Sequence, residues 1–180
     1  MKEIVKLKGD ILSIAENGYL DVVVHGCNCF CIMGAGIALQ IAHRYPEIKS
    51  IDIRTVCGGI SKLTNHTMGV VGNHSTFKII NAYTQYKPGH VLDKTALYSN
   101  IKKTVRNIFS LGPEELLKGL SREKNQIVRI GFPRIGAGIA GGDWNIISNI
   151  IKQEYEECVY RDYYELYFVK FSTVSTVLKK

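Results

Sequence analysis

The chain has 180 residues, of which 46% are hydrophobic and 22% charged, a size and balance typical of one globular domain. It contains no apolar run of about 18 residues, which argues against a membrane-spanning helix, and its start lacks the pattern of a signal peptide. The net charge of +7 favours an anionic partner. The lysines are scattered, however, and form no basic block with interleaved aromatics of the kind that binds RNA. We expect a single domain over residues 1–180, with a polar, basic tail at about 172–180.

Five cysteines are present, and three of them fall within five residues. They are Cys27, Cys29, Cys31, Cys57 and Cys158. An odd number so crowded is a poor disulfide framework, which fits a reducing compartment such as the cytoplasm. His25 alternates with the first three cysteines as metal ligands could, but the second, distant pair of a structural zinc site is missing. We therefore expect small buried thiols and no metal.

Strands and helices alternate along the first half of the chain. Strands are expected at residues 3–7 and 20–25, the second with a β-branched run that suits burial on both faces. A helix follows over residues 35–45, where apolar residues recur at helical spacing, and Pro46 closes it. Residues 68–71 and 77–82 then predict two strands joined by a turn, which indicates a hairpin.

The second half continues the alternation. Asp93 can cap a helix that ends at residues 112–113, before a shorter helical segment at 114–120. A strand is expected at 127–132, Asp143 opens another helix, and a last strand is expected at 166–171.

This order predicts an α/β fold with a central mixed, largely parallel sheet covered on both faces. Ligands of such sheets bind where loops leave the carboxyl ends of the strands. The loops after Val24, Ala82 and Phe132 are therefore the places to look for chemistry.

Two of these loops are rich in glycine, and each lies between a strand and a helix. They cover residues 25–36 and 132–142. Free backbone amides and a helix dipole can hold a phosphate there, and glycine lets the phosphate approach the backbone. Neither loop is a Walker motif, and the Gly-x-Gly-x-x-Gly letters at 136–141 lack the acidic residue of a dinucleotide fingerprint. Two such loops in one domain indicate a clamp for a pyrophosphate.

Several ordered motifs carry a family resemblance. They are Gly9-Asp10-Ile11, His25-Gly-Cys-Asn28, Met33-Gly-Ala-Gly-Ile-Ala38, Pro133-Arg-Ile-Gly-Ala-Gly138 and Gly141-Gly142-x-Trp144. Together they resemble macro domains, in the branch of the yeast-type ADP-ribose 1″-phosphate phosphatases and the terminal ADP-ribose protein glycohydrolase. The resemblance covers about residues 6–171. It implies a three-layer α/β/α macro domain that binds ADP-ribose derivatives and needs no cofactor.

The resemblance also implies a role for individual residues. Asp10 would accept a hydrogen bond from the adenine amino group beside the Ile11 backbone, Asn28 would hold the distal ribose, and Phe171 would lie against the adenine. The phosphates and distal ribose would be wrapped by Met33, Gly34, Ala35, Gly36, Ile37 and Ala38, and by Pro133, Ile135, Gly136, Ala137, Gly138, Ile139 and Ala140. Asp10 as a turn residue, Asn28 as a loop cap and Phe171 as a core residue are the alternatives.

The branch decides the expected chemistry. The glycohydrolase uses a lysine and an aspartate where this chain has Ala82 and Ala140, so the phosphatase branch fits better. There His25 would take part directly, and Asp143 would orient or activate a water. The alternatives are a hydrogen-bonded core histidine and a helix N-cap.

We therefore expect a metal-independent phosphatase that removes the 1″-phosphate of ADP-ribose 1″-phosphate. One alternative is an ADP-ribosyl hydrolase that acts on ADP-ribosylated protein or nucleic acid. The other is a non-catalytic reader of ADP-ribose, since a fold and a pocket do not establish turnover. No membrane partner is expected.

Overall fold

The computed structural model describes residues 3–73, 75–121 and 126–174. Its centre is a six-stranded sheet in the order β1-β6-β5-β2-β4-β3. The strands are β1 (Val5–Lys8), β2 (Val22–Asn28), β3 (His66–Val71), β4 (Phe77–Gln85), β5 (Val128–Phe132) and β6 (Tyr164–Lys170). All neighbours pair in parallel except β3, which is antiparallel to β4 at one edge. The expected mixed, largely parallel sheet is therefore confirmed.

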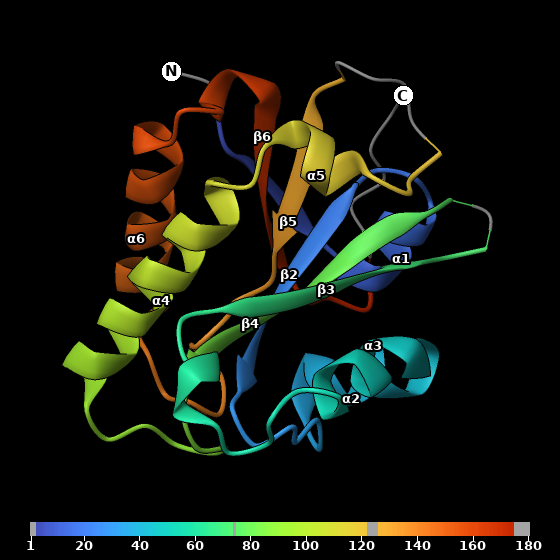
Figure 1. Ribbon diagram of the computed structural model, residues 1–180. Coiled ribbons are helices and arrows are strands. Elements are labelled where there is room, and N and C mark those ends of the chain that lie inside the picture. The colour runs from blue at the N-terminus through green and yellow to red at the C-terminus, as the bar shows by residue number, and fades with distance from the viewer. Residues whose placement is uncertain (1–2, 74, 122–125, 175–180) are drawn as a thin grey trace.

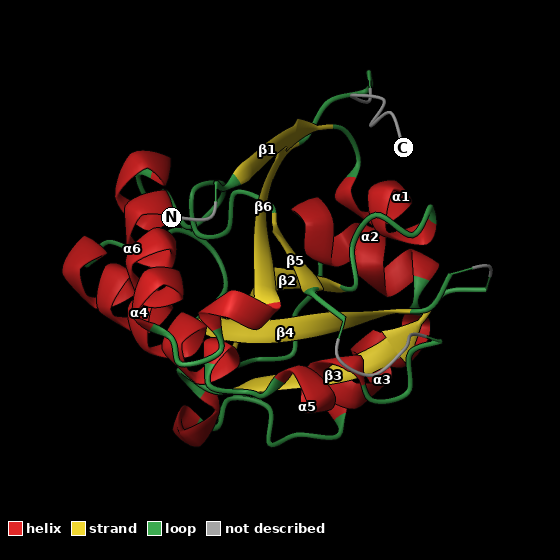
Figure 2. Ribbon diagram, turned by 90° about the horizontal axis from the view of Figure 1, so that it is seen from above, coloured by secondary structure: helices red, strands yellow, loops and turns green. Residues whose placement is uncertain are grey.

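Helices cover both faces of this sheet, as Figures 1 and 2 show. The α-helices are α1 (Ile11–Glu16), α2 (Gly36–Arg44), α3 (Pro46–Ile53), α4 (Lys94–Phe109), α5 (Pro113–Leu117) and α6 (Trp144–Glu157). Short 3-10 turns lie at Ile60–Lys62 and Arg161–Tyr163. Helices α4 and α6 lie side by side on one face, whereas α1, α2 and α3 lie on the other. The three-layer α/β/α architecture is confirmed.

The β-branched run of β2 explains why both faces need cover. Val22 and Val24 are completely buried in the core that includes α4 and α6, while Val23 is buried in the core that includes α1, α2 and α3. Side chains alternate between the faces of a strand, so an uninterrupted apolar run requires a hydrophobic layer on each side. β2 consequently lies in the middle of the sheet, between β5 and β4.

The structure differs from the sequence expectation around two short helices. Pro46 does not merely close the preceding helix but begins α3, because proline suits the first turn, where its missing N–H is not needed. α1 was not expected: it has only six residues and is started by Asp10, whose side chain accepts a hydrogen bond from the Leu12 amide. The hairpin of β3 and β4 is confirmed, although residue 74 of its turn, like the end of the expected tail, lies outside the described residues.

In the described residues no helix has both the length and the apolar character needed to span a membrane. The carboxyl ends of the five parallel strands lie at one edge of the sheet. The loops that leave this edge include both glycine-rich segments.

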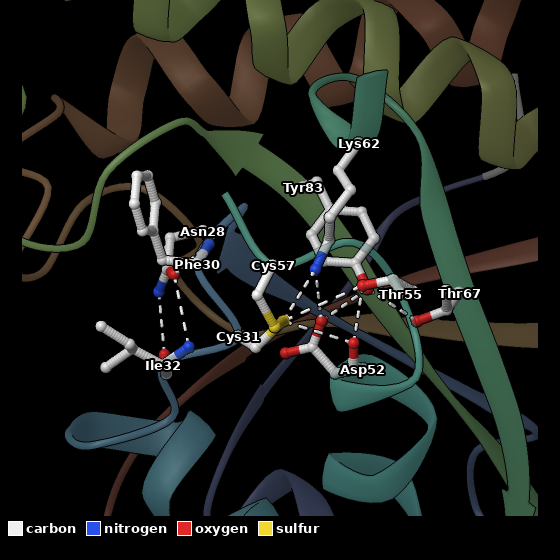
Figure 3. Close-up of a disulfide and its surroundings, with 10 residues drawn as sticks. All are labelled: Asn28, Phe30, Cys31, Ile32, Asp52, Thr55, Cys57, Lys62, Thr67 and Tyr83. Atoms are coloured by element: carbon white, nitrogen blue, oxygen red, sulfur yellow. Dashed lines mark hydrogen bonds and ion pairs between the residues drawn. A yellow bond between two sulfur atoms is a disulfide. The ribbon is translucent and has the colours of Figure 1, made fainter. Parts of the chain in front are cut away.

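A disulfide joins the first of these loops to the chain after α3 (Figure 3), which corrects the expectation that the cysteines are all free thiols. Cys31 and Cys57 form the bridge across a sequence separation of 26 residues. The sequence did not suggest this pair, because it is α2 and α3 that return the chain to the loop. Cys27 and Cys29 are buried thiols, as expected, and Cys158 is also free.

A buried ion pair lies against the bridge. Lys62 Nζ is 2.8 Å from Asp52 Oδ1 and 3.3 Å from Cys31 Sγ, and the Tyr83 hydroxyl donates to the same Asp52 oxygen at 2.7 Å (Figure 3). Asp52 and Lys62 are both buried. Removing either one would leave the other as an unpaired buried charge, which is strongly destabilising. Through its contact with Cys31, this cluster holds the first glycine-rich loop in place.

We predict that Cys57→Ser lowers the free energy of unfolding by about 3 kcal/mol, because the bridge closes a long loop in the unfolded chain. Urea denaturation with and without dithiothreitol measures this. The wild type should lose a similar amount in reductant, whereas the variant should not respond. Cys158→Ser, which leaves the bridge intact, is the control. Equal stability of the wild type in both conditions would contradict the bridge.

Candidate ligand-binding site

Two adjoining cavities lie at the carboxyl ends of the strands. The larger has a volume of about 540 Å³ and is lined by both glycine-rich loops. The smaller, of about 250 Å³, lies beside Asp10 and Phe171. Gly36, Ile37 and Pro133 line both, so the cavities form one elongated cleft.

The first wall of the larger cavity is the start of α2. Its N-cap residue, Ala35, is in extended conformation and offers no side-chain hydrogen bond to the helix. The first-turn amides of a helix have no partner within the helix, so those of Gly36, Ile37 and Ala38 stay available beside the cavity that these residues line. Together with the positive end of the helix dipole, they make a site for an anion.

The second wall is the loop between β5 and α6. Hydrogen bonds from Gly142 N to Gly136 O and from Gly141 N to Gly138 O, of 2.8 and 2.9 Å, curl this loop. Within the described part of the chain, the amides of Gly138, Ile139 and Ala140 have no hydrogen-bond acceptor. These three residues line the larger cavity, so the loop adds a second set of free donors.

Gly136 and Gly138 of this loop are required for different structural reasons. Gly136 has φ +68°, and a Cβ there would lie 2.8 Å from Ile101 Cδ1, inside the core. A Cβ on Gly138 would meet nothing within 4 Å. Gly136 therefore allows the loop to pack, whereas Gly138 keeps the surface of the cleft open.

Asp10 lies at the far end of the cleft, in the smaller cavity. Its carboxylate accepts hydrogen bonds from Leu12 N at 3.0 Å, Ser13 Oγ at 2.7 Å and Arg44 Nη1 at 2.6 Å. Burial alone would raise the pKa of Asp10, but the bonds from Ser13, Arg44 and Leu12 lower it below its ordinary value. The carboxylate is therefore ionised and fixed in place, and it both caps α1 and lines the cavity.

Most of the expected ligand-binding residues line this cleft. They are Asp10, Ile11, Asn28, Gly34, Ala35, Gly36, Ile37, Ala38, Pro133, Ile135, Gly136, Gly138, Ile139, Ala140 and Phe171. Phe171 is 65% exposed at the rim rather than part of the core.

Two expected residues lie elsewhere. Met33 is buried in a cluster with Cys27, Cys29 and Tyr83, so it packs behind the loop and not toward a ligand. Ala137 packs against the core below the second loop, and its amide already donates to Arg134 O at 3.3 Å. Neither residue lines the two cavities, because adjacent residues of a tight loop face in different directions.

The sequence analysis missed further residues that line the cleft. They are Gly9, Gly26, Cys27, Ile32, Gln40, Thr84, Gln85, Pro88, Gly89, Arg134 and Val169. The loop after β4 was expected to contribute, but no motif distinguished Thr84 or Gln85 within it. Arg134 is the one cationic side chain that lines either cavity in the described parts of the chain.

Asn28 holds its own loop. Its Oδ1 accepts from Phe30 N at 2.9 Å and Ile32 N at 3.4 Å, and its Nδ2 donates to Ile32 O at 2.8 Å (Figure 3). Since a carboxamide nitrogen carries two hydrogens, one remains for a ligand in the cavity that Asn28 lines. The loop-cap alternative thus describes most of the contacts of this side chain.

His25 does not lie where the expected direct catalytic role would need it. The residue is completely buried, does not line either cavity, and forms a 2.6 Å hydrogen bond between its Nε2 and Asn81 Oδ1. Nε2 is the donor, because the Asn81 oxygen can only accept. Burial lowers the pKa of His25 to about 4. The imidazole is therefore a neutral core group, beneath the cleft and out of reach of a ligand.

Asp143 does not act as expected either. It is the exposed N-cap of α6, and its Oδ1 accepts from Asn145 N at 2.7 Å. It lines neither of the two cavities. The helix N-cap alternative therefore describes the contacts of this side chain.

Cys27 lines the larger cavity, but its side chain is buried and its thiol is a poor nucleophile. Burial raises the pKa of both Cys27 and Cys29, so the protonated form dominates at neutral pH. Among the residues that the structure describes, no three His, Cys, Asp or Glu side chains are grouped to hold a metal ion.

The burial of His25 predicts an acid sensitivity of the fold. Between pH 6.5, its ordinary pKa, and about 4, the unfolded chain takes up a proton that the folded chain does not, so stability falls as the pH falls. Glutamine does not titrate. Between pH 7 and pH 4 the free energy of unfolding of His25→Gln should therefore fall by on the order of 3 kcal/mol less than that of the wild type. Chemical denaturation of both proteins at pH 7 and pH 4 measures it. Parallel losses in the two proteins would contradict a buried neutral imidazole.

Comparison with known proteins agrees with this architecture. The family model described as "Macro domain" matches residues 24–151. Among curated proteins, the chain is 34% identical over 148 residues to an uncharacterized 17.5 kDa protein of the tk-vs intergenic region of Enterobacteria phage T4, covering 81% of this chain and 85% of that protein. It is 25% identical over 177 residues to the ADP-ribose 1″-phosphate phosphatase of Saccharomyces cerevisiae, covering 85% and 93%.

Solved structures share the fold at low sequence identity. The macrodomain of Thermus aquaticus DarG has a TM-score of 0.65 and 16% identity, over 94% of this chain and 98% of that chain. A Trypanosoma brucei macrodomain in complex with ADP-ribose has a TM-score of 0.56 and 15% identity, over 93% and 63%. Since the family model covers more than half of the sequence, this chain belongs to the macro domain family.

Proposed function

We propose that the cleft binds ADP-ribose and that the protein removes the 1″-phosphate from ADP-ribose 1″-phosphate. The observation that carries the proposal is the lining of one cavity by two sets of free backbone amides, at the start of α2 and in the loop before α6. Two such sets suit the two phosphates of a pyrophosphate. The Trypanosoma brucei relative, in complex with ADP-ribose, supports the choice of ligand.

The smaller cavity suits the adenine of this ligand. Asp10 has four lone-pair sites and accepts three hydrogen bonds from the protein, so it can accept one more from an amino group. The exposed ring of Phe171 lies at the same cavity and offers a face for stacking. A base bound there would leave the pyrophosphate near the shared residues Gly36 and Ile37.

The phosphatase part of the proposal is supported by the yeast relative, which is named for this activity. Among the described residues that line the larger cavity, none is a carboxylate or a histidine. We therefore assign transition-state stabilisation to the loop amides and to Arg134, which would neutralise charge on the phosphoryl oxygens. A water adds to phosphorus, the bond to the sugar oxygen breaks, and a proton from the water passes to that oxygen, which yields inorganic phosphate and ADP-ribose.

The binding step is tested with Gly138→Val. Free ADP-ribose should raise the melting temperature of the wild type, because a ligand of the native state shifts unfolding by mass action. The added side chain starts in open space at the cleft, so the variant should fold normally and bind at least about tenfold more weakly by calorimetry. Gly112→Ala is the control, since its Cβ would only touch Tyr160 at 3.5 Å. Unchanged affinity of Gly138→Val would refute the position of the phosphates.

The chemical step is tested with Arg134→Gln. Release of phosphate from ADP-ribose 1″-phosphate should proceed in the presence of chelator, and the variant should be slower by about ten- to a hundredfold. Arg54→Gln, which changes an exposed arginine outside both cavities, is the control. Binding of ADP-ribose without phosphate release would make the protein a reader. Removal of ADP-ribose from modified protein or nucleic acid would favour the hydrolase alternative.

A further inference from the structure

Thr84 lies in the floor of the larger cavity, and the proposed chemistry above does not use it. It is the second-last residue of β4. Its neighbours pair with β2, Tyr83 with Cys27 and Gln85 with Asn28, so the register shifts and leaves Thr84 without a partner in β2. Bulges of this kind change the direction of a side chain and are frequent beside binding sites.

The hydroxyl of Thr84 has no hydrogen-bond partner among the described residues. The residue is only 1% exposed, and nearly all buried polar side-chain atoms in folded proteins are paired. An unpaired buried hydroxyl is costly in the free protein. A ligand that supplies a partner therefore gains binding free energy.

Glycine at position 26 keeps protein side chains away from this hydroxyl. A Cβ on Gly26 would lie 3.1 Å from Thr84 Oγ1, 3.7 Å from Ile135 Cβ and 3.9 Å from Gly136 N. All four residues line the larger cavity. A side chain at position 26 would therefore cover the Thr84 hydroxyl, and glycine leaves it uncovered on this side.

The sheet order indicates which part of a ligand would lie near Thr84. Asp10 and Phe171 follow β1 and β6, whereas Thr84 belongs to β4, on the other side of β5 and β2. The three strand spacings from β6 to β4 amount to roughly 14 Å. A ligand with its base beside Asp10 and its phosphates above β5 and β2 would bring its terminal sugar to Thr84.

We propose that Thr84 Oγ1 binds an oxygen of the terminal ribose group, either a sugar hydroxyl or an oxygen of the 1″-phosphate. This rests on the proposed function and goes beyond it, because it makes Thr84 the residue that selects ADP-ribose derivatives over ADP. A site built to bond a ligand oxygen discriminates strongly against an analogue that lacks it.

The test is Thr84→Val, which keeps the shape of the side chain and removes the hydroxyl. Without ligand, the variant should melt at the same temperature as the wild type or higher, because an unpaired buried hydroxyl is removed. By calorimetry, affinity for ADP-ribose should fall about tenfold, while affinity for ADP stays unchanged. Thr84→Ser should restore wild-type affinity.

The ligands and variants separate the possible results. A larger loss with ADP-ribose 1″-phosphate than with ADP-ribose assigns the bond to the phosphate, and an equal loss assigns it to the sugar. A lower melting temperature of Thr84→Val, or an equal loss of affinity for ADP, would overturn the role of Thr84 and leave the proposed function standing. Wild-type protein that binds neither ADP-ribose nor its 1″-phosphate would overturn both.

Discussion

The backbone amides at the carboxyl edge of the sheet are the groups on which the cleft depends. Most buried N–H groups of a protein are paired. Yet the N-cap of α2 is Ala35, whose side chain cannot cap a helix, and within the described residues the loop before α6 leaves several amides without acceptors. Serine or aspartate at position 35 would satisfy a helix amide and would also close the anion site. An uncapped helix end is therefore a sign of ligand binding here, and glycine keeps the approach open at Gly138.

A polar network below the cleft holds this edge in position. His25 is bonded to Asn81, whose Nδ2 donates to Thr67 Oγ1 at 3.1 Å, and Thr67 in turn contacts the Tyr83 hydroxyl at 3.0 Å. Tyr83 donates to Asp52, the partner of the buried lysine beside the disulfide. The network runs from β2 through β4 and β3 to the segment that secures the first glycine-rich loop. Buried networks of this kind specify one arrangement when every member is paired.

The sequence predicted the parts of this molecule that depend on local pattern. The alternation of strands and helices predicted the three layers, and glycine between a strand and a helix predicted both binding loops. Both patterns depend only on residues that are close together in the sequence. Asp10 and Phe171 are far apart in sequence, and only the family resemblance placed them at one site, where the structure brings them together.

The failures share a physical cause. His25 was expected at the end of a strand, but β2 continues to Asn28 and places His25 in its middle. Periodicity does not tell where such a strand ends or which way the side chain faces, and here it faces the core. Cys31 and Cys57 meet only because two helices return the chain. Thr84 depends on a register shift between β2 and β4, which no single strand can reveal.

These failures also change where the chemistry of the cleft must reside. With His25 neutral and enclosed and Asp143 engaged as a helix cap, the groups proposed to meet a phosphate are backbone amides, Arg134 and the hydroxyl of Thr84, beside the free N–H of Asn28. Amides and a guanidinium keep their protonation state across the physiological range. A phosphate site built from them recognises charge and shape without a group that titrates near neutral pH. Its pH dependence should therefore follow the second ionisation of a bound phosphate and, at low pH, the stability of the fold.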